Sequence, residues 1–171
     1  MHHTRRPRAL LVVPLVWLAA VLVILPAGAV AEIHITLTNA FIDKYKDRVT
    51  IDATYTVDGA HKKPNAPSQD GDLHVAGRAP EIGLASVAVI MNAASVPTAV
   101  SAAQQAEGGS AISISGVWRI WTEHGGDQQH IQGQALKPAD TTNPDHVFQI
   151  HPITVIGGQA VLSTLVPIDL K

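Results

Sequence analysis

The chain has 171 residues, of which 46% are hydrophobic and 15% charged, and its formal net charge is −2. This length suits a single domain once any targeting segment is set aside. Because the sequence contains no cysteine, it excludes disulfides, thiolate metal ligands and a lipoprotein anchor, so an exported form would depend on its hydrophobic core for stability.

The N-terminus has the pattern of an export signal. Arginines within residues 5–8 precede an apolar run over residues 9–25, and the Ala-Val-Ala of residues 29–31 offers a small-residue cleavage site. We predict a signal peptide over residues 1–31, a mature chain that begins at Glu32, and a secreted or periplasmic location. An uncleaved anchor is the alternative, and it is the only membrane contact we expect.

The remaining chain is acidic. Residues 32–171 carry all fourteen Asp and Glu but only nine of the twelve Lys and Arg, which gives a formal charge of −5. This charge opposes generic nucleic-acid binding, which depends on clustered basic side chains. Small basic groups at residues 44–48 and 62–63 are typical of a solvated surface.

Alternating hydrophobic and polar residues predict β-strands in the first half of this region. The strongest pattern covers residues 49–58, where Val, Ile, Ala and Tyr alternate with Thr and Asp. An earlier strand is predicted over residues 33–38, a loop over 59–71, and further strands from Leu73 and over 86–91.

One short helix is predicted after these strands, from Ser95 to Glu107. Ser95 can cap it, Pro97 suits its first turn, and the glycines at 108–109 end it. We then expect further strands and, between the first two of them, a long polar loop. These strands cover residues 112–123, 146–156 and 160–168, and the loop covers 125–144.

This order of elements predicts a mainly β fold, a small Greek-key barrel that is OB-like, with the helix from Ser95 to Glu107 between strands. The predicted domain covers residues 32–171. A generic small barrel or sandwich with one helix is the alternative.

The segment Asp-Gly-Asp-Leu-His-Val at residues 70–75 places two acids and a histidine within five positions. Asp70 and Asp72 suit a turn, because glycine between them tolerates positive φ. Period-two alternation puts Asp72 and His74 on the same side of the following strand, where a carboxylate can orient an imidazole or share a cation with it. A structural corner with a surface histidine is the alternative.

A second polar cluster lies near the end of the chain. Gln149 and His151 share one face of a predicted strand that is otherwise apolar, whereas His146, five residues before His151, falls on the opposite face. We predict that Asp72, His74 and His151 form one site, although a hydrogen-bonded structural histidine is the alternative.

The tryptophans of the central strand are expected to lie on opposite faces. One of Trp118 and Trp121 then belongs to the core, and the other can stack on a ligand or cover the barrel surface. Downstream, Glu123, His124 and His130 are an unspecific metal-ligand set. The sequence has no nucleophile elbow, P-loop or paired-histidine zinc motif, so no catalytic residue is predicted.

Three motifs together resemble a group of small uncharacterised bacterial proteins. These are Asp-Gly-Asp-Leu-His-Val at residues 70–75, Gly-Val-Trp at 116–118 leading to His124-Gly125, and Gln-Ile-His-Pro-Ile at 149–153. The resemblance extends from residue 49 to 156 and implies an OB-like barrel whose polar cluster includes His124. The chain departs from the group in its longer stretch after His124.

The function we predict is an exported binding module for an unknown ligand or protein. The expected binding residues are Asp70, Asp72, His74, His124 and His151. A metal-dependent, phosphodiesterase-like hydrolase is one alternative, with a divalent ion held by Asp72, His74 and His151 together with Asp70. An interaction protein without a small-molecule site is the other.

Overall fold

The computed structural model describes residues 32–161, which fall within Ala31–Lys171, one of the two compact units into which the chain divides. The predicted signal peptide and its cleavage site lie outside the described residues, and so do residues 162–171. Among residues 32–161, no helix is both long enough and apolar enough to cross a membrane.

The described part of the chain consists mainly of strands. The strands are β1 (His34–Thr36), β2 (Thr50–Ala60), β3 (Leu73–Arg78), β4 (Ser86–Ile90), β5 (Ala111–Ile120), β6 (Gln129–Ile131), β7 (Phe148–Ile156) and β8 (Gln159–Ala160). The helices are α1 (Asn39–Tyr45) and α2 (Pro97–Gln105), with short 3-10 helices η1 (Ala93–Ser95) and η2 (Thr122–His124).

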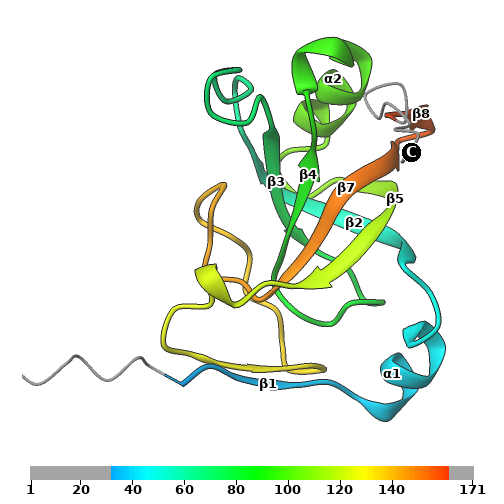
Figure 1. Ribbon diagram of the computed structural model, residues 1–171, viewed down its shortest axis with the longest axis vertical. Helices are drawn as coiled ribbons and strands as arrows, with labels where there is room; N and C mark the ends of the chain where they lie inside the picture. The colour runs from blue at the N-terminus through cyan, green and yellow to red at the C-terminus, as the bar shows by residue number, and fades with distance from the viewer. Residues whose placement is uncertain (1–31, 162–171) are drawn as a thin grey trace, which may run out of the picture. The chain divides into compact units, whose positions relative to one another are not determined.

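Five of these strands close into a barrel (Figure 1). Their order is β4-β3-β2-β5-β7, and a parallel pairing between β4 and β7 joins the two ends of the sheet. The other neighbouring pairs in the barrel are antiparallel, and α2 connects β4 to β5. The mainly β barrel predicted from the sequence is therefore confirmed, and its strand order is consistent with a small OB-like barrel.

Strand β2 shows how alternation separates the inside of the barrel from the outside. Ile51 and Tyr55 are fully buried, whereas Asp52 is exposed. The Tyr55 hydroxyl donates to the carbonyl of Ser86 at 2.9 Å, so its polar atom is satisfied within the core. Burial also raises the pKa of this phenol well above its usual value.

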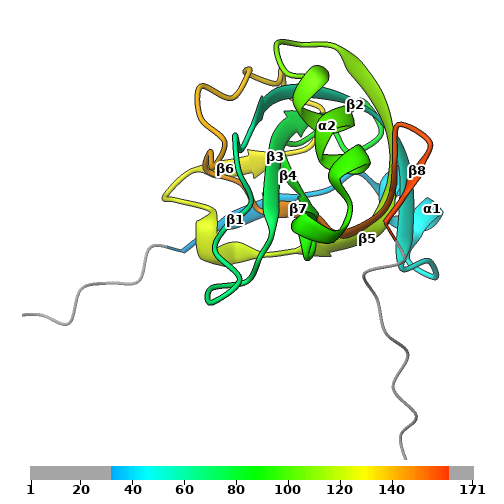
Figure 2. The same cartoon turned by 90° about the horizontal axis from the view of Figure 1, so that it is seen from above.

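Helix α2 lies over one end of the barrel, as the view from above shows (Figure 2). It begins at Pro97 and turns Ala99 and Ala103 into the hydrophobic core. This is the helix predicted between Ser95 and Glu107, and the small alanine side chains let the helix approach the strands closely.

A second helix, α1, was not predicted from the sequence. Thr38 caps it by accepting a hydrogen bond from the Phe41 backbone N–H at 3.4 Å. The Phe41 ring meets Trp118 edge-on at 5.6 Å and Phe148 at 5.9 Å between centroids. Helix α1 thus adds aromatic rings to the same core that the barrel strands enclose.

Two further details refine the strand predictions. The polar stretch over residues 125–144 contains β6, which pairs in parallel with β1 to form a separate two-stranded sheet. The last predicted strand, over residues 160–168, lies almost entirely outside the described residues, and β8 ends at Ala160.

Candidate functional site

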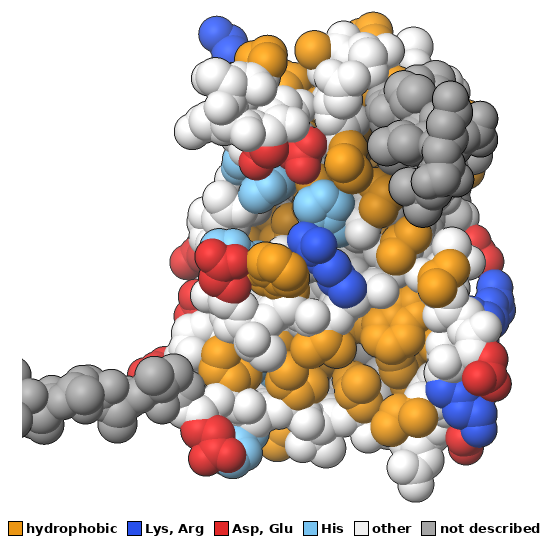
Figure 3. Space-filling model, in the orientation of Figure 1, with side chains coloured by type: hydrophobic (Ala, Val, Ile, Leu, Met, Phe, Trp, Pro, Cys, Tyr) orange, Lys and Arg blue, Asp and Glu red, His pale blue; other side chains and the backbone are white. Residues whose placement is uncertain are grey.

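The predicted polar residues lie on the outer face of β3, β4, β7 and β5. Core side chains flank His74 on β3 and Gln149 on β7, and His151 follows the buried Ile150, so these three residues face outward. The register places Gln149 beside Val87 of β4 and opposite Arg119 of β5. Acidic, basic and histidine side chains gather over β4 and β7 in Figure 3.

A tight turn presents the two acids at the start of β3. Gly71 has φ of 70°, and Asp70 accepts hydrogen bonds from the Asp72 backbone N–H at 2.9 Å and from the Asn65 amide at 3.0 Å. The bond from the Asp72 backbone lowers the pKa of Asp70. Burial instead raises the pKa of Asp72. Oδ1 of the Asp72 carboxylate accepts a hydrogen bond from the Asn92 backbone N–H at 3.2 Å.

The His151 ring lies between the carboxylate of Asp72 and the guanidinium of Arg119. Its Nε2 is 3.6 Å from Oδ2 of Asp72, although the two residues come from distant parts of the sequence. Nη2 of Arg119 donates to Nδ1 of the same ring at 2.6 Å. Burial, and next the charge of Arg119, lower the pKa of His151 to about 4, so the ring is neutral near pH 7.

The hydrogen bonds continue from Arg119 in the other direction. Nε of Arg119 donates to the side-chain oxygen Oε1 of Gln149 at 2.8 Å, and the side-chain Nε2 of Gln149 donates to Nε2 of His146 at 3.1 Å. Nδ1 of the buried His146 donates to the carbonyl of Pro144 at 2.6 Å. We call the linked side chains the polar network. Its members are Asp72, Arg119, His146, Gln149 and His151.

His124 adjoins this network through His146. The two rings stack with centroids 5.5 Å apart. They line a cavity of about 260 Å³ together with Asn143 and Asp145. Burial lowers the pKa of His146, and a charge on His124 would lower it further. The structure thus brings His124 next to the network without a direct contact to Asp72 or His151.

His74 lies at the edge of the same face. Its Nδ1 donates to the Asn143 side-chain oxygen at 2.7 Å, and its ring stacks on His61 at 5.0 Å. A charge on His74 would also lower the pKa of His151, after the larger effects of burial and Arg119. Of the predicted trio, Asp72 and His151 are in contact, and His74 is their neighbour.

The two tryptophans separate as expected. Trp118 is partly buried and packs against the hydrophobic core, stacked on Phe148 at 5.7 Å between centroids. Trp121 is 36% exposed, and the Arg119 guanidinium lies over its ring, 4.3 Å from the centroid. An exposed aromatic surface therefore borders the polar network.

Sequence reasoning missed the central member of the network. Arg119 contacts both Gln149 and His151, yet in the sequence it is only the residue after Trp118. The feature that could have identified Arg119 was its outward position on β5, where it pairs with the outward-facing Gln149 of β7. His61 and Asn143 were also missed, because they lie in segments predicted only as loops.

The contacts of His151 bear on the metal prediction. Among residues 32–161, no three His, Asp or Glu side chains converge in an arrangement that could hold a metal ion. Arg119 places a positive charge 2.6 Å from Nδ1 of His151, which opposes a cation at this ring. This contact favours the binding interpretation of the cluster over the metal-dependent hydrolase.

Replacing Arg119 with glutamine should raise the pKa of His151 from about 4 toward 6.5, although burial, the larger cause of the shift, remains. The variant removes the adjacent positive charge, while the negative charge of Asp70 still favours the protonated ring. An NMR titration of the imidazole resonances measures the shift. Arg119→Lys keeps a positive charge and should change the pKa less. An unchanged pKa in Arg119→Gln would show that burial alone sets it.

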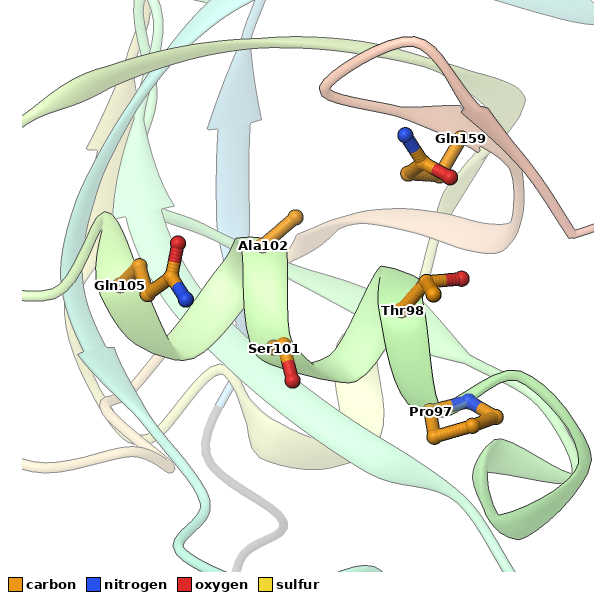
Figure 4. A pocket seen from close by; sticks show the side chains of 6 residues that line it. All are labelled: Pro97, Thr98, Ser101, Ala102, Gln105 and Gln159. Atoms are coloured by element: carbon orange, nitrogen blue, oxygen red, sulfur yellow. The ribbon is translucent and has the colours of Figure 1, made fainter.

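Another concavity lies between α2 and β8 (Figure 4). It encloses about 400 Å³ and is lined only by neutral side chains, among them Thr98, Ser101 and Gln159. It contains none of the predicted site residues.

No family model, no curated protein and no solved structure matches this chain. The resemblance based on the motifs at residues 70–75 and 149–153 therefore stays a prediction. Function has to be inferred from the geometry of the face itself.

Proposed function

We propose that the protein is a binding module that holds its ligand on the outer face of β3, β4, β5 and β7, over the polar network. The observation that carries this proposal is the continuity of the network. Side chains from two strands and from the segment before β7 are hydrogen-bonded from His151 to His146, and the Asp72 carboxylate lies 3.6 Å from Nε2 of His151. Such mutual bonding fixes each side chain in place, and preorganised polar groups are what a specific binding site needs.

The position of the face on the barrel supports the same conclusion. OB barrels bind their ligands on the face of the second and third strands, between the loops that flank it. Here those strands correspond to β3 and β4, which follow β2 in the barrel. Residues 61–72 and 121–147 are the flanking segments, and they supply Asp72, His124 and His146.

The charge of the chain narrows the ligand classes. OB barrels commonly bind oligonucleotides or oligosaccharides. The formal charge of −5 over residues 32–171 opposes the first class. We propose a ligand other than a nucleic acid, encountered outside the cytoplasm, where the signal-like residues 1–31 would direct the protein.

The proposal is tested by NMR on the full-length chain with four probes: glucose, glucuronate, glycine and inorganic phosphate. At least one probe should shift the resonances of Arg119, Gln149 and His151. Binding should weaken roughly tenfold in His151→Ala, as expected for the loss of one hydrogen bond. Gln159→Ala, in the cavity beside α2, is the matched control and should not change the affinity.

Two outcomes would contradict this proposal. Shifts confined to the cavity between α2 and β8 would place binding elsewhere on the molecule. No shift with any of the four probes would favour the alternative of an interaction protein without a small-molecule site.

A further inference from the structure

We propose that Arg119 is an oxyanion-binding residue, and that the ligand carries a carboxylate or phosphate group that pairs with its guanidinium. This inference rests on the proposed binding function and names the ligand chemistry. It is carried by three features of Arg119: its lack of an acidic partner, its fixed orientation and its partial burial.

The guanidinium is bonded only to neutral acceptors. Its Nε donates to Oε1 of the Gln149 side chain, and its Nη2 donates to Nδ1 of His151. Nη1 makes no hydrogen bond to any residue between 32 and 161. Within the same range, no carboxylate oxygen lies within 4.0 Å of it. Arg78 differs, because its guanidinium donates hydrogen bonds of 3.1 to 3.3 Å to the Asp58 carboxylate.

The guanidinium is also held in a fixed orientation. Gln149 and His151 hold it along one edge, and the Trp121 ring lies under its face with a centroid distance of 4.3 Å. A planar guanidinium presents its remaining N–H groups as a fork that matches carboxylate and phosphate oxygens. Because it is already oriented, binding an oxyanion would cost little further side-chain entropy.

Partial burial makes an incoming anion favourable. Arg119 is only partly exposed, and burial lowers its pKa, which indicates that its charge has lost hydration without gaining a charged partner. The nearest acid of the network, Asp72, contacts Nε2 of His151, whereas Arg119 contacts Nδ1. The imidazole ring therefore stands between that carboxylate and the guanidinium.

The test compares ligands that differ by a charge, on the full-length chain. Glucuronate and glucose share a sugar ring, but only glucuronate has a carboxylate, and inorganic phosphate tests the other oxyanion. We expect glucuronate or phosphate to shift the Arg119 Nε–H and Trp121 indole resonances. Glucose should bind at least tenfold more weakly than the oxyanion that binds. The pattern between the two anions identifies which group is recognised.

Three variants assign the effect to Arg119. Arg119→Gln should weaken oxyanion binding at least tenfold, and Arg119→Lys, which keeps the charge but loses the fork, should give an intermediate loss. Arg78→Gln is the matched control, because Arg78 is already paired with Asp58, and it should leave anion binding unchanged. If Arg119→Gln does not fold, Arg119→Lys and the direct Nε–H shifts still decide the question.

The inference and the proposed function can fail separately. Glucose binding on this face without any response to glucuronate, phosphate or glycine, each of which carries an anionic oxygen group, would overturn the oxyanion inference and leave the binding function standing. Anion-induced shifts that Arg119→Gln leaves intact, or that Arg78→Gln abolishes equally, would also overturn it. Binding of no probe at all would contradict both.

Discussion

Replacing Phe148 with alanine should lower the free energy of unfolding by about 3–5 kcal/mol. The ring is fully buried at the start of β7, between Trp118, with which it stacks, and Phe41 of α1. Its removal leaves a cavity that the surrounding barrel strands cannot collapse to fill, because they are hydrogen-bonded to one another. Urea unfolding followed by circular dichroism measures the loss.

Val49→Ala is the control for this prediction. Val49 is 73% exposed, so its truncation should change the free energy of unfolding by no more than about 0.5 kcal/mol. A loss of less than about 1 kcal/mol in Phe148→Ala would contradict the aromatic packing described here. Because Phe148 immediately precedes Gln149, the variant should also loosen the network face.

Replacing Gly77 with alanine should lower the free energy of unfolding by about 1–3 kcal/mol. A Cβ atom at this position would lie 2.6 Å from Cε1 of Tyr55 and closer still to the backbone oxygen of Thr56. The tyrosine cannot move aside easily, because its hydroxyl is bonded to the Ser86 carbonyl at 2.9 Å and to the Ser86 hydroxyl at 3.1 Å. Thermal or urea unfolding measures the effect.

Gly59→Ala is the matched control on the neighbouring strand. A Cβ atom there would meet its nearest atoms at 3.5 Å, which is ordinary van der Waals contact. Its effect on the free energy of unfolding should stay within about 0.5 kcal/mol. Equal losses in Gly59→Ala and Gly77→Ala would contradict the idea that the close approach to Tyr55 and Thr56 sets the cost.

Local patterns were sufficient to predict the barrel strands and α2. Alternation over residues 49–58 identifies β2 because one face is buried and the other is not, and Pro97 marks the start of α2. Helix α1 has seven residues, too few turns for a clear helical period. The three residues of β6 become a strand only because β1 lies alongside them, a contact that no local pattern contains.

The candidate site was predictable in part for the same reason. Alternation placed Gln149 and His151 on one face, and the turn before His74 drew attention to Asp72. What brings Asp72 to His151 is barrel closure between β4 and β7, since β3 pairs with β4 on the other side. A single sequence does not specify that parallel pairing, and Arg119 becomes the centre of the network only once β5 and β7 are paired.

The polar network also has a direction. A guanidinium has no acceptor, so Arg119 donates along both branches, and each following N–H points away from it. One branch ends at the carbonyl of Pro144, and on the other Nε2 of His151 faces the Asp72 carboxylate at 3.6 Å, beyond hydrogen-bond distance. His146 must then carry its single proton on Nδ1 and His151 on Nε2. One arginine therefore selects opposite tautomers in two histidines, and protonating either ring would set an N–H against the donor that now faces it.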